Sequence, residues 1–497
     1  MVANRGEIAL RVIRACRELG IRSVAVYSDA DRSAPHVLAA DEAYRIGPAP
    51  AGESYLRVEG LLEVARRSGA EGVHPGYGFL AERASFADAV VDAGLKFVGP
   101  RGWTIQAMGN KTDARHRMME AGVPVVPGTA TPLADAHEAV ERAREIGFPV
   151  LLKAAAGGGG KGMRVVQAEE EVERAFEGAV REASQAFGDG AVYVEKFLTR
   201  PRHVEIQLLG DEHGNIVHLG ERECSIQRRH QKLIEEAPSP AMDPELREAM
   251  GTAAVQAAQA VDYVGAGTVE FLLDGRDFFF LEMNTRIQVE HPVTELVTGI
   301  DLVKWQLRVA GGEALDFAQE DIAFRGHAIE CRITSEDPAR GFLPATGRIR
   351  DVTLPAGPGV RWDGGIVPGL EVGLHYDPLL GKLIAYGPDR AAAIETMRRA
   401  LDELRIEGVV TCIPFHRRTM EDSDFRAGTF SIQYLEQRPN LLEGELSQEA
   451  RKAAAVAGAL LENERREAFH PRVKEGFRTG TPLSQWQRTA WPWTNGS

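Results

Sequence analysis

Residues 282–290 read Glu282-Met283-Asn284-Thr285-Arg286-Ile287-Gln288-Val289-Glu290, and every second side chain in this stretch is polar. A strand turns successive side chains to opposite faces, so an extended backbone would place all five polar groups on one side. These groups are two carboxylates, two amides and a guanidinium, whereas an ordinary half-exposed strand more often carries Lys, Thr or Ser. The stretch is therefore predicted to line a functional face of a sheet.

The residues before this stretch predict a β-hairpin. Residues 268–283 have the pattern strand, turn, strand, with the turn at Asp274-Gly275-Arg276. In a hairpin centred on that turn, Glu270 and Glu282 lie directly opposite each other, with Cβ atoms roughly 5 Å apart. Two carboxylates there are destabilising without a cation, and Mg²⁺ prefers oxygen ligands. Glu270, Glu282 and Asn284 are candidate metal ligands; the alternative is an exposed polar hairpin.

Length and composition narrow the class of protein. The 497 residues suffice for two to four domains, and 44% hydrophobic and 26% charged residues are ordinary for a globular protein. A net charge of -14 argues against a nucleic-acid coat protein. The four cysteines show no metal-ligand spacing, which suggests a reducing compartment. Without a signal peptide or a long apolar run, we expect a cytoplasmic enzyme with no nucleic-acid or membrane partner.

The first third of the chain predicts a parallel sheet flanked by helices. Helical patterns at about 7–19, 58–68 and 86–93 alternate with strand patterns at 23–27, 72–74 and 96–98. Only Met1-Val2-Ala3 precedes the first helix, so the first strand is short or the start is clipped. Ligands of such sheets bind at the carboxyl ends of the strands, where His74-Pro75-Gly76-Tyr77-Gly78 would lie. A plain turn is the alternative.

A separate small unit is predicted from about residue 123 to residue 198. Gly157-Gly158-Gly159-Gly160 lies between two strand patterns, and Lys153 and Lys161 flank it. Four glycines leave backbone N–H groups free to approach an anion, which predicts a flap over phosphates; a passive linker is the alternative. Lys111, which opens a helix, is either an anion contact or a surface lysine.

Three later segments of the chain also carry predictions of structure or ligand binding. Residues 220–232 are dense in charge, which in an acidic protein suggests an anionic ligand, with a solvated charge run as the alternative. His291-Pro292 predicts the start of a helix that reaches about Val309. Ser447 to Phe469 is rich in Ala and Glu and predicts a helix before a polar tail.

Together these motifs resemble biotin carboxylase, an ATP-grasp enzyme. The resemblance covers about residues 1–440 and rests on six motifs. They are Ala3-Asn4-Arg5-Gly6-Glu7-Ile8-Ala9, His74 through Leu80, the four glycines, Arg202 through Gln207, Gln227 through Lys232, and Glu282 through Thr294. It implies an α/β fold, α+β toward the C-terminus, with a preATP-grasp domain at 1–110, an ATP-grasp domain at 111–325 that includes a mobile lid at about 123–198, a C-terminal domain at 326–440 and a tail at 441–497.

The family's reaction forms carboxyphosphate from ATP and bicarbonate and passes the carboxyl group to N1 of biotin on a carrier protein. By motif position, the implied ATP contacts are Lys111, Lys153, Gly158, Gly159, Gly160, Met163, Glu195, Lys196, Leu198, His203, Gln227 and His230. Glu270, Glu282 and Asn284 would hold Mg²⁺ or Mn²⁺, two ions with ATP. The implied bicarbonate and biotin contacts are Lys232, Arg286, Gln288, Val289, Glu290, Arg332 and Tyr77, with Glu290 as general base and Arg332 stabilising the biotin enolate.

The resemblance also implies partners. No Met-Lys-Met biotin-attachment sequence occurs in the chain, so a separate biotin carboxyl carrier protein and carboxyltransferase subunits are expected, and the family suggests a homodimer. The resemblance leaves open whether the chain is part of an acetyl-CoA, a propionyl-CoA or a pyruvate carboxylase. Another ATP-grasp ligase and a nucleotide-binding subunit without turnover are the competing hypotheses. A dehydrogenase is excluded because no GxGxxG follows the first strand.

Overall fold

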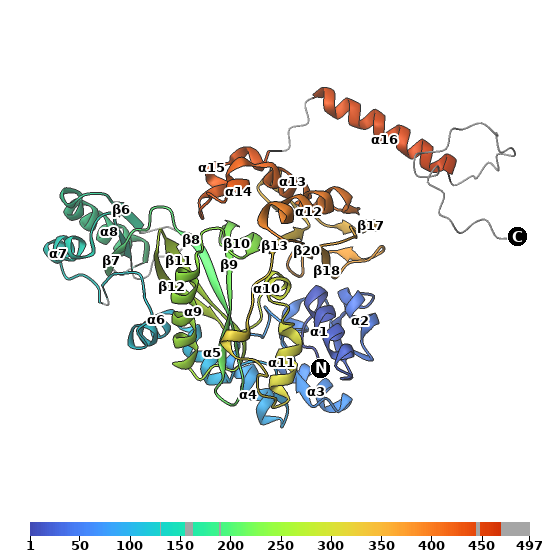
Figure 1. Cartoon of the computed structure of the whole chain (residues 1–497), viewed down its shortest axis with the longest axis horizontal. Coiled ribbons are helices and arrows are strands. Elements are labelled where there is room, and N and C mark those ends of the chain that lie inside the picture. The colour runs from blue at the N-terminus through green and yellow to red at the C-terminus, as the bar shows by residue number, and fades with distance from the viewer. Residues whose placement is uncertain (130, 155–162, 188–189, 444–447, 469–497) are drawn as a thin grey trace, which may run out of the picture. The chain divides into compact units, whose positions relative to one another are not determined.

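The computed structural model describes residues 1–129, 131–154, 163–187, 190–443 and 448–468 (Figure 1). The chain divides into two compact units, Met1–Glu443 and Gly444–Ser497. In the second unit, the described residues form the predicted helix, α16 (Gln448–Ala468). Across all of these ranges, no helix combines the length and the apolar character needed to cross a lipid bilayer.

The N-terminal residues form the parallel arrangement that the sequence predicted. β1 (Val24–Ser28) pairs in parallel with β2 (Glu42–Gly47), and β3 (Gly72–Val73) pairs with β4 (Lys96–Phe97). The short first strand is reduced to Val2, which bridges β1 and the residue that follows β3. The neighbouring helices are α1 (Gly6–Glu18), α2 (Pro35–Ala39), α3 (Val58–Ser68), α4 (Ala84–Asp92) and α5 (Gly102–Gly109).

An eight-stranded antiparallel sheet forms the centre of the first unit. Its order is β12-β11-β8-β9-β10-β13-β20-β18. The strands are β8 (Arg202–Gly210), β9 (Ile216–Arg228), β10 (Gln231–Ala237), β11 (Gly265–Asp274), β12 (Asp277–Asn284), β13 (His327–Thr334), β18 (Val360–Gly364) and β20 (Leu379–Gly387). β10 and β13 pair with Ile234 opposite Cys331, so the sheet continues across the domain boundary predicted at residue 325.

The two faces of this sheet differ in polarity. On one face, Ile206 belongs to a buried apolar cluster with α9 (Pro244–Gln259), and Ile329 belongs to another with α12 (Arg390–Glu403). Because side chains alternate along a strand, the residues next to Ile206 and Ile329 on their strands point to the other face of the sheet. α10 (His291–Thr298) packs against that face. That second face carries the charged residues of the candidate site.

The hairpin of β11 and β12 has the predicted register, with Glu270 opposite Glu282. Gly275 in the turn has φ +66°, a conformation that glycine adopts without strain. A bulge after Glu270 adjusts the pairing. The prediction of an extended backbone up to residue 290 is wrong beyond Asn284, where β12 ends and an irregular segment begins.

A smaller sheet of order β6-β5-β7 lies within the unit predicted for residues 123–198. Its elements are β5 (Val150–Ala154), β6 (Met163–Val166), β7 (Val192–Lys196), α7 (Ala136–Ile146) and α8 (Val172–Phe187). α6 (Lys111–Glu120) precedes them. The four glycines at 157–160 lie outside the described residues, and so does the side chain of Lys111.

The helix predicted for residues 291–309 is in fact two helices. α10 ends at Thr298 and α11 (Leu302–Ala310) follows, because Gly299 adopts φ +76° and ends the first helix. The later helices are α13 (Ile413–Glu421), α14 (Ser423–Ala427) and α15 (Tyr434–Gln437). The short strands are β14 (Glu336–Asp337), β15 (Leu343–Pro344), β16 (Gly347–Arg348), β17 (Asp351–Thr353), β19 (Glu371–Val372) and β21 (Arg405–Glu407).

Candidate active site

Four charged residues form a row across the polar face of the sheet. Glu270 on β11 lies directly opposite Glu282 on β12 and Glu205 on β8, and Glu205 lies opposite Arg222 on β9. Opposed side chains on neighbouring strands approach within contact distance. Three adjacent carboxylates repel one another, so this row requires cations close to them.

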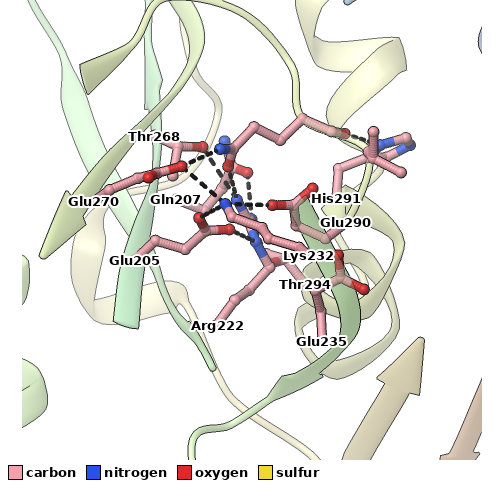
Figure 2. Close-up of polar contacts among 12 residues, drawn as sticks. Glu205, Gln207, Arg222, Lys232, Glu235, Thr268, Glu270, Glu290, His291 and Thr294 are labelled. Carbon is pink, nitrogen blue, oxygen red and sulfur yellow. Dashed lines mark hydrogen bonds and ion pairs between the residues drawn. The ribbon is translucent and has the colours of Figure 1, made fainter. Parts of the chain in front are cut away.

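Lys232, near the start of β10, supplies one of these cations (Figure 2). Its Nζ donates to Glu205 Oε2 at 2.5 Å, to Glu270 Oε1 at 2.8 Å and to Glu290 Oε1 at 2.7 Å. Burial opposes the charged amine, but the three carboxylates raise the pKa of Lys232 well above its ordinary value. Lys232 therefore remains a cation and draws residues from three separate segments into one site.

Arg222 supplies the second cation and is completely buried. It donates to Glu205 Oε1 at 2.6 Å, Gln207 Oε1 at 2.6 Å and Gln288 Oε1 at 2.7 Å, and it also reaches the hydroxyls of Thr268 and Thr294 (Figure 2). The five acceptors lie on the sheet, on the segment that follows β12 and, for Thr294, on α10. Arg222 therefore fixes that segment against the sheet.

Glu290 lies between Lys232 and Arg332. Its second oxygen accepts from Arg332 Nη2 at 2.9 Å, while Arg332 Nε donates to Glu235 Oε1 at 2.5 Å. Burial alone would raise the pKa of Glu290, but Lys232, Arg332 and Arg222 together lower it well below its ordinary value. The carboxylate is thus ionised at neutral pH.

The segment after β12 brings two more predicted residues to this site. Gln288 is buried and donates from Nε2 to Glu270 Oε1 at 2.8 Å. Arg286 donates to Asn284 Oδ1 at 2.9 Å, and its Nε lies 3.0 Å from Glu82 Oε2. Polar side chains of this segment therefore reach the site although their backbone is not a strand.

The candidate metal ligands carry oxygen donors on one face. Glu270 accepts from Lys232, Gln288 and Asn284 Nδ2, and its Oε2 lies 2.8 Å from His203 Nε2. Burial opposes ionisation, but Lys232 and His203 lower the pKa of Glu270 well below its ordinary value. An ionised Glu270 opposite Glu282, with the amide oxygen of Asn284 two residues along, suits a hard divalent cation such as Mg²⁺.

The predicted nucleotide residues are only partly brought together. Lys153 Nζ lies 2.5 Å from Glu195 Oε1, and Gln227 Nε2 lies 3.5 Å from His203 Nδ1. The Lys196 amine donates to the carbonyls of Gly147 and Phe148. His230 and Met163 are exposed and Leu198 is half-buried. Tyr77 lies apart from these residues, and its hydroxyl donates to Glu7.

Sequence reasoning missed three residues of this site: Glu205, Arg222 and Glu235. The alternation in residues 203–208 and the dense charge in 220–232 were visible. Neither pattern identified which residues would meet, because Glu205 and Arg222 become neighbours only through the pairing of β8 with β9. His203, Glu205 and Glu270 offer ligand atoms within 4.8 Å of one another, so Glu205 is a further candidate ligand.

Glu235 should make the stability of this fold depend on pH. Burial raises the pKa of Glu235 to about 7, although Arg332 acts in the opposite direction. The folded protein then holds a proton that an unfolded glutamate releases near 4.5, so the free energy of unfolding falls as pH rises from about 4.5 to 7. Glu235→Gln should reduce that fall by at most about 1.4 kcal/mol per pH unit.

Urea unfolding of wild type and Glu235→Gln at several pH values between 4.5 and 7.5 measures this effect. Glu236→Gln, on the same strand, is the matched control. Burial opposes ionisation of Glu236, but His327 and Arg390 lower its pKa, so its stabilising contribution is lost only as pH falls below about 4.5. Equal slopes for wild type and Glu235→Gln would contradict the assignment.

Comparison with known proteins gives consistent matches along the chain. Family models match residues 1–105 (Biotin carboxylase, N-terminal domain), 110–318 (Carbamoyl-phosphate synthase L chain, ATP binding domain) and 330–437 (Biotin carboxylase C-terminal domain). A pyruvate carboxylase subunit of Methanothermobacter thermautotrophicus is 55% identical over 90% of this chain and 91% of its own length. Biotin carboxylase of Nostoc sp. is 52% identical over 88% and 98%.

A solved structure supports the same relationship. The biotin carboxylase domain dimer of Hydrogenobacter thermophilus 2-oxoglutarate carboxylase, in complex with MgADP, ADP and bicarbonate, is 50% identical to this chain. It aligns with a TM-score of 0.78 over 89% of this chain and 98% of that one.

Proposed function

The chain belongs to the biotin carboxylase family of ATP- and bicarbonate-dependent ligases, and we propose that it carboxylates biotin carried on a separate protein. The observation that carries this proposal is Glu290, a buried carboxylate held between Lys232 and Arg332. A base and two anion-binding cations at one point suit the activation of bicarbonate beside a second substrate that develops negative charge.

The nucleotide is proposed to bind between the polar face of the sheet and the predicted lid. Lys111 and Lys153 would neutralise its phosphates; the remaining proposed contacts are Gly158, Gly159, Gly160, Met163, Glu195, Lys196, Leu198, His203, Gln227 and His230. Glu270, Glu282 and Asn284 would hold Mg²⁺ or Mn²⁺, two ions with ATP, which offset the charge of the transferred phosphoryl group. Closure of the lid would exclude water from carboxyphosphate, which water decomposes.

Bicarbonate is proposed to bind beside Glu290. Lys232, Arg286, Gln288 and the backbone of Val289 would hold the anion, since a guanidinium matches a planar oxyanion with two hydrogen bonds. An incoming anion shares Lys232 with Glu290 and adds negative charge, which raises the pKa of Glu290 toward a useful range. Glu290 would then accept the proton of bicarbonate while an oxygen of bicarbonate attacks the γ-phosphorus of ATP.

Biotin is proposed to enter on the Arg332 side of the same site, near Tyr77. Arg332 would stabilise the negative charge of the biotin enolate, and the carboxyl group of carboxyphosphate would pass to N1. Inorganic phosphate would leave in this step and take up the proton that N1 loses. The carrier would be a biotin carboxyl carrier protein that works with carboxyltransferase subunits, and the working form a homodimer. The final acceptor is proposed to be acetyl-CoA or a related acyl-CoA.

The purified protein should release ADP only with ATP, Mg²⁺ and bicarbonate, and free biotin or a biotinylated carrier domain should accelerate this release. EDTA should abolish it, since Glu270 and Glu282 need the metal to approach the phosphates. Incorporation of labelled bicarbonate into biotin provides the second readout. ADP release that ignores biotin would favour another ATP-grasp ligase. With the biotinylated carrier present, no turnover at all would overturn the proposal.

Assays with separate carboxyltransferases test the final acceptor. Acetyl-CoA, propionyl-CoA, pyruvate and 2-oxoglutarate should be compared, because relatives of this chain are named as subunits of pyruvate and 2-oxoglutarate carboxylases. Transfer to an oxo acid alone would contradict the acyl-CoA proposal and leave the biotin carboxylation itself unaffected.

A further inference from the structure

Two sequence motifs without a role in the proposed chemistry meet at one buried ion pair. Glu7 belongs to the Ala3–Ala9 motif at the start of α1, and Lys382, on β20, ends the Asp377–Lys382 motif. Lys382 Nζ lies 3.1 Å from Glu7 Oε1, and the lysine side chain is completely buried. A buried ion pair is seldom favoured over apolar packing for stability alone. The presence of this pair therefore needs another explanation, which its contacts supply.

The first of these contacts reaches the proposed bicarbonate site. Lys382 Nζ donates to the backbone oxygen of Val289 at 2.8 Å. That oxygen belongs to the peptide bond between Val289 and Glu290, so Lys382 restrains the backbone from which the Glu290 side chain projects. Lys382 is itself fixed by the sheet, where it lies directly opposite Arg332 in the pairing of β13 with β20.

The second contact reaches the proposed biotin side. Glu7 Oε1 also accepts a hydrogen bond from the Tyr77 hydroxyl. The loop that carries Tyr77 is held by Asn4, whose Nδ2 donates to the carbonyls of Pro75 and Tyr77, each at 2.7 Å. The Ala3–Ala9 motif thus fixes both the side chain and the backbone of Tyr77.

A third set of contacts anchors the Asp377–Lys382 motif to the N-terminal residues. Arg5 donates to both oxygens of Asp31 at 2.7 Å, and its guanidinium lies 4.1 Å from the ring centroid of Tyr376. The Tyr376 hydroxyl lies 2.6 Å from Ser28 Oγ and from the carbonyl of Ala49. Tyr376 directly precedes the motif. Its contacts hold the N-terminal end of the motif, and the pair with Glu7 holds Lys382 at the other end.

We propose that Glu7 and Lys382 are positioning residues for the carboxylation reaction. Through them, the Val289–Glu290 peptide on the bicarbonate side and Tyr77 on the biotin side keep one fixed relative arrangement. This inference rests on the proposed function, because that function assigns bicarbonate to one side of the site and biotin to the other. Catalysis requires such groups to be placed within a fraction of an ångström, and a buried lysine with two fixed acceptors supplies that placement.

The test compares Lys382→Met with the double variant Glu7→Gln/Lys382→Met. The single variant leaves the Glu7 carboxylate buried without its cation and should lower the unfolding midpoint. The double variant removes both charges and should recover much of that midpoint. It should nevertheless raise the apparent KM for bicarbonate, lowering kcat/KM by about tenfold to a hundredfold, as expected for the loss of a hydrogen bond from a charged donor.

Arg390→Met is the matched control. It breaks the pair that Arg390, at the start of α12, forms with the buried Glu236 on β10. Neither side chain is hydrogen-bonded to Val289 or Tyr77. A purely structural effect reduces the fraction of active enzyme, which lowers kcat and leaves KM unchanged, and we expect this of Arg390→Met. A double variant with wild-type KM values for bicarbonate and biotin would overturn the inference. Failure of the wild type itself to carboxylate biotin would instead overturn the proposed function.

Discussion

Glu290→Gln is expected to lower bicarbonate-dependent ADP release by about 10²–10⁴-fold, the range typical of a lost general base. Glutamine keeps the size of the side chain and one oxygen acceptor for Lys232 or Arg332. It cannot accept the proton of bicarbonate. The loss should therefore fall mainly on kcat, with the apparent KM for ATP unchanged, because the proposed nucleotide contacts lie elsewhere. Steady-state ADP release with varied bicarbonate and ATP measures both quantities.

Glu236→Gln is the appropriate control for this variant. Glu236 is also a buried glutamate with cationic partners, Arg390 and His327, but it points away from Lys232 and Arg332. A loss of turnover in both variants would indicate a general effect of removing buried negative charge. Unchanged kcat in Glu290→Gln would contradict the assignment of Glu290 as the base, while leaving the binding roles of Lys232 and Arg286 open to separate variants.

The strand-turn-strand pattern of residues 268–283 predicted the hairpin correctly, but the alternation in residues 282–290 did not predict the course of the chain after it. Alternation specifies which side chains share a face only while the backbone is a strand. β12 ends at Asn284. Gln288 still reaches Glu270 because Arg222, on β9 of the same sheet as Glu270, holds the side-chain oxygen of Gln288. The outcome matched the prediction for these side chains, but a tertiary contact produced it.

Helix boundaries and strand neighbours show where reasoning from one sequence stops. Local pattern gave the apolar periodicity of residues 291–309, yet it did not identify Gly299 as a left-handed stop. Glu205 lies in an alternating stretch and Arg222 in a charged one, and nothing local indicates that β8 pairs with both β9 and β11. The motifs that carry the family resemblance include Lys232 and Glu290, which the structure brings together, whereas the contacts of Arg222 required the three-dimensional structure.

Arg222→Met is expected to destabilise the fold by about 3–5 kcal/mol, the usual cost of leaving a buried charge without its partner. The variant removes the donor to Glu205 Oε1, Gln207 Oε1 and Gln288 Oε1 at once, in a site where no side-chain surface of Arg222 is exposed. Such a loss is a large share of the roughly 5–15 kcal/mol by which domains are stable. Urea unfolding followed by fluorescence and circular dichroism measures it.

Two further variants separate buried charge from lost packing. Arg222→Met/Glu205→Gln removes both charges and should recover part of the stability, because Lys232 then has fewer carboxylates to neutralise. Arg247→Met breaks a partly exposed pair with Glu221 on the same strand and should cost much less. If Arg222→Met were no more destabilising than Arg247→Met, Arg222 would not be the residue that holds the segment after β12 against the sheet. Its five acceptors would then have to be satisfied by water or by rearrangement.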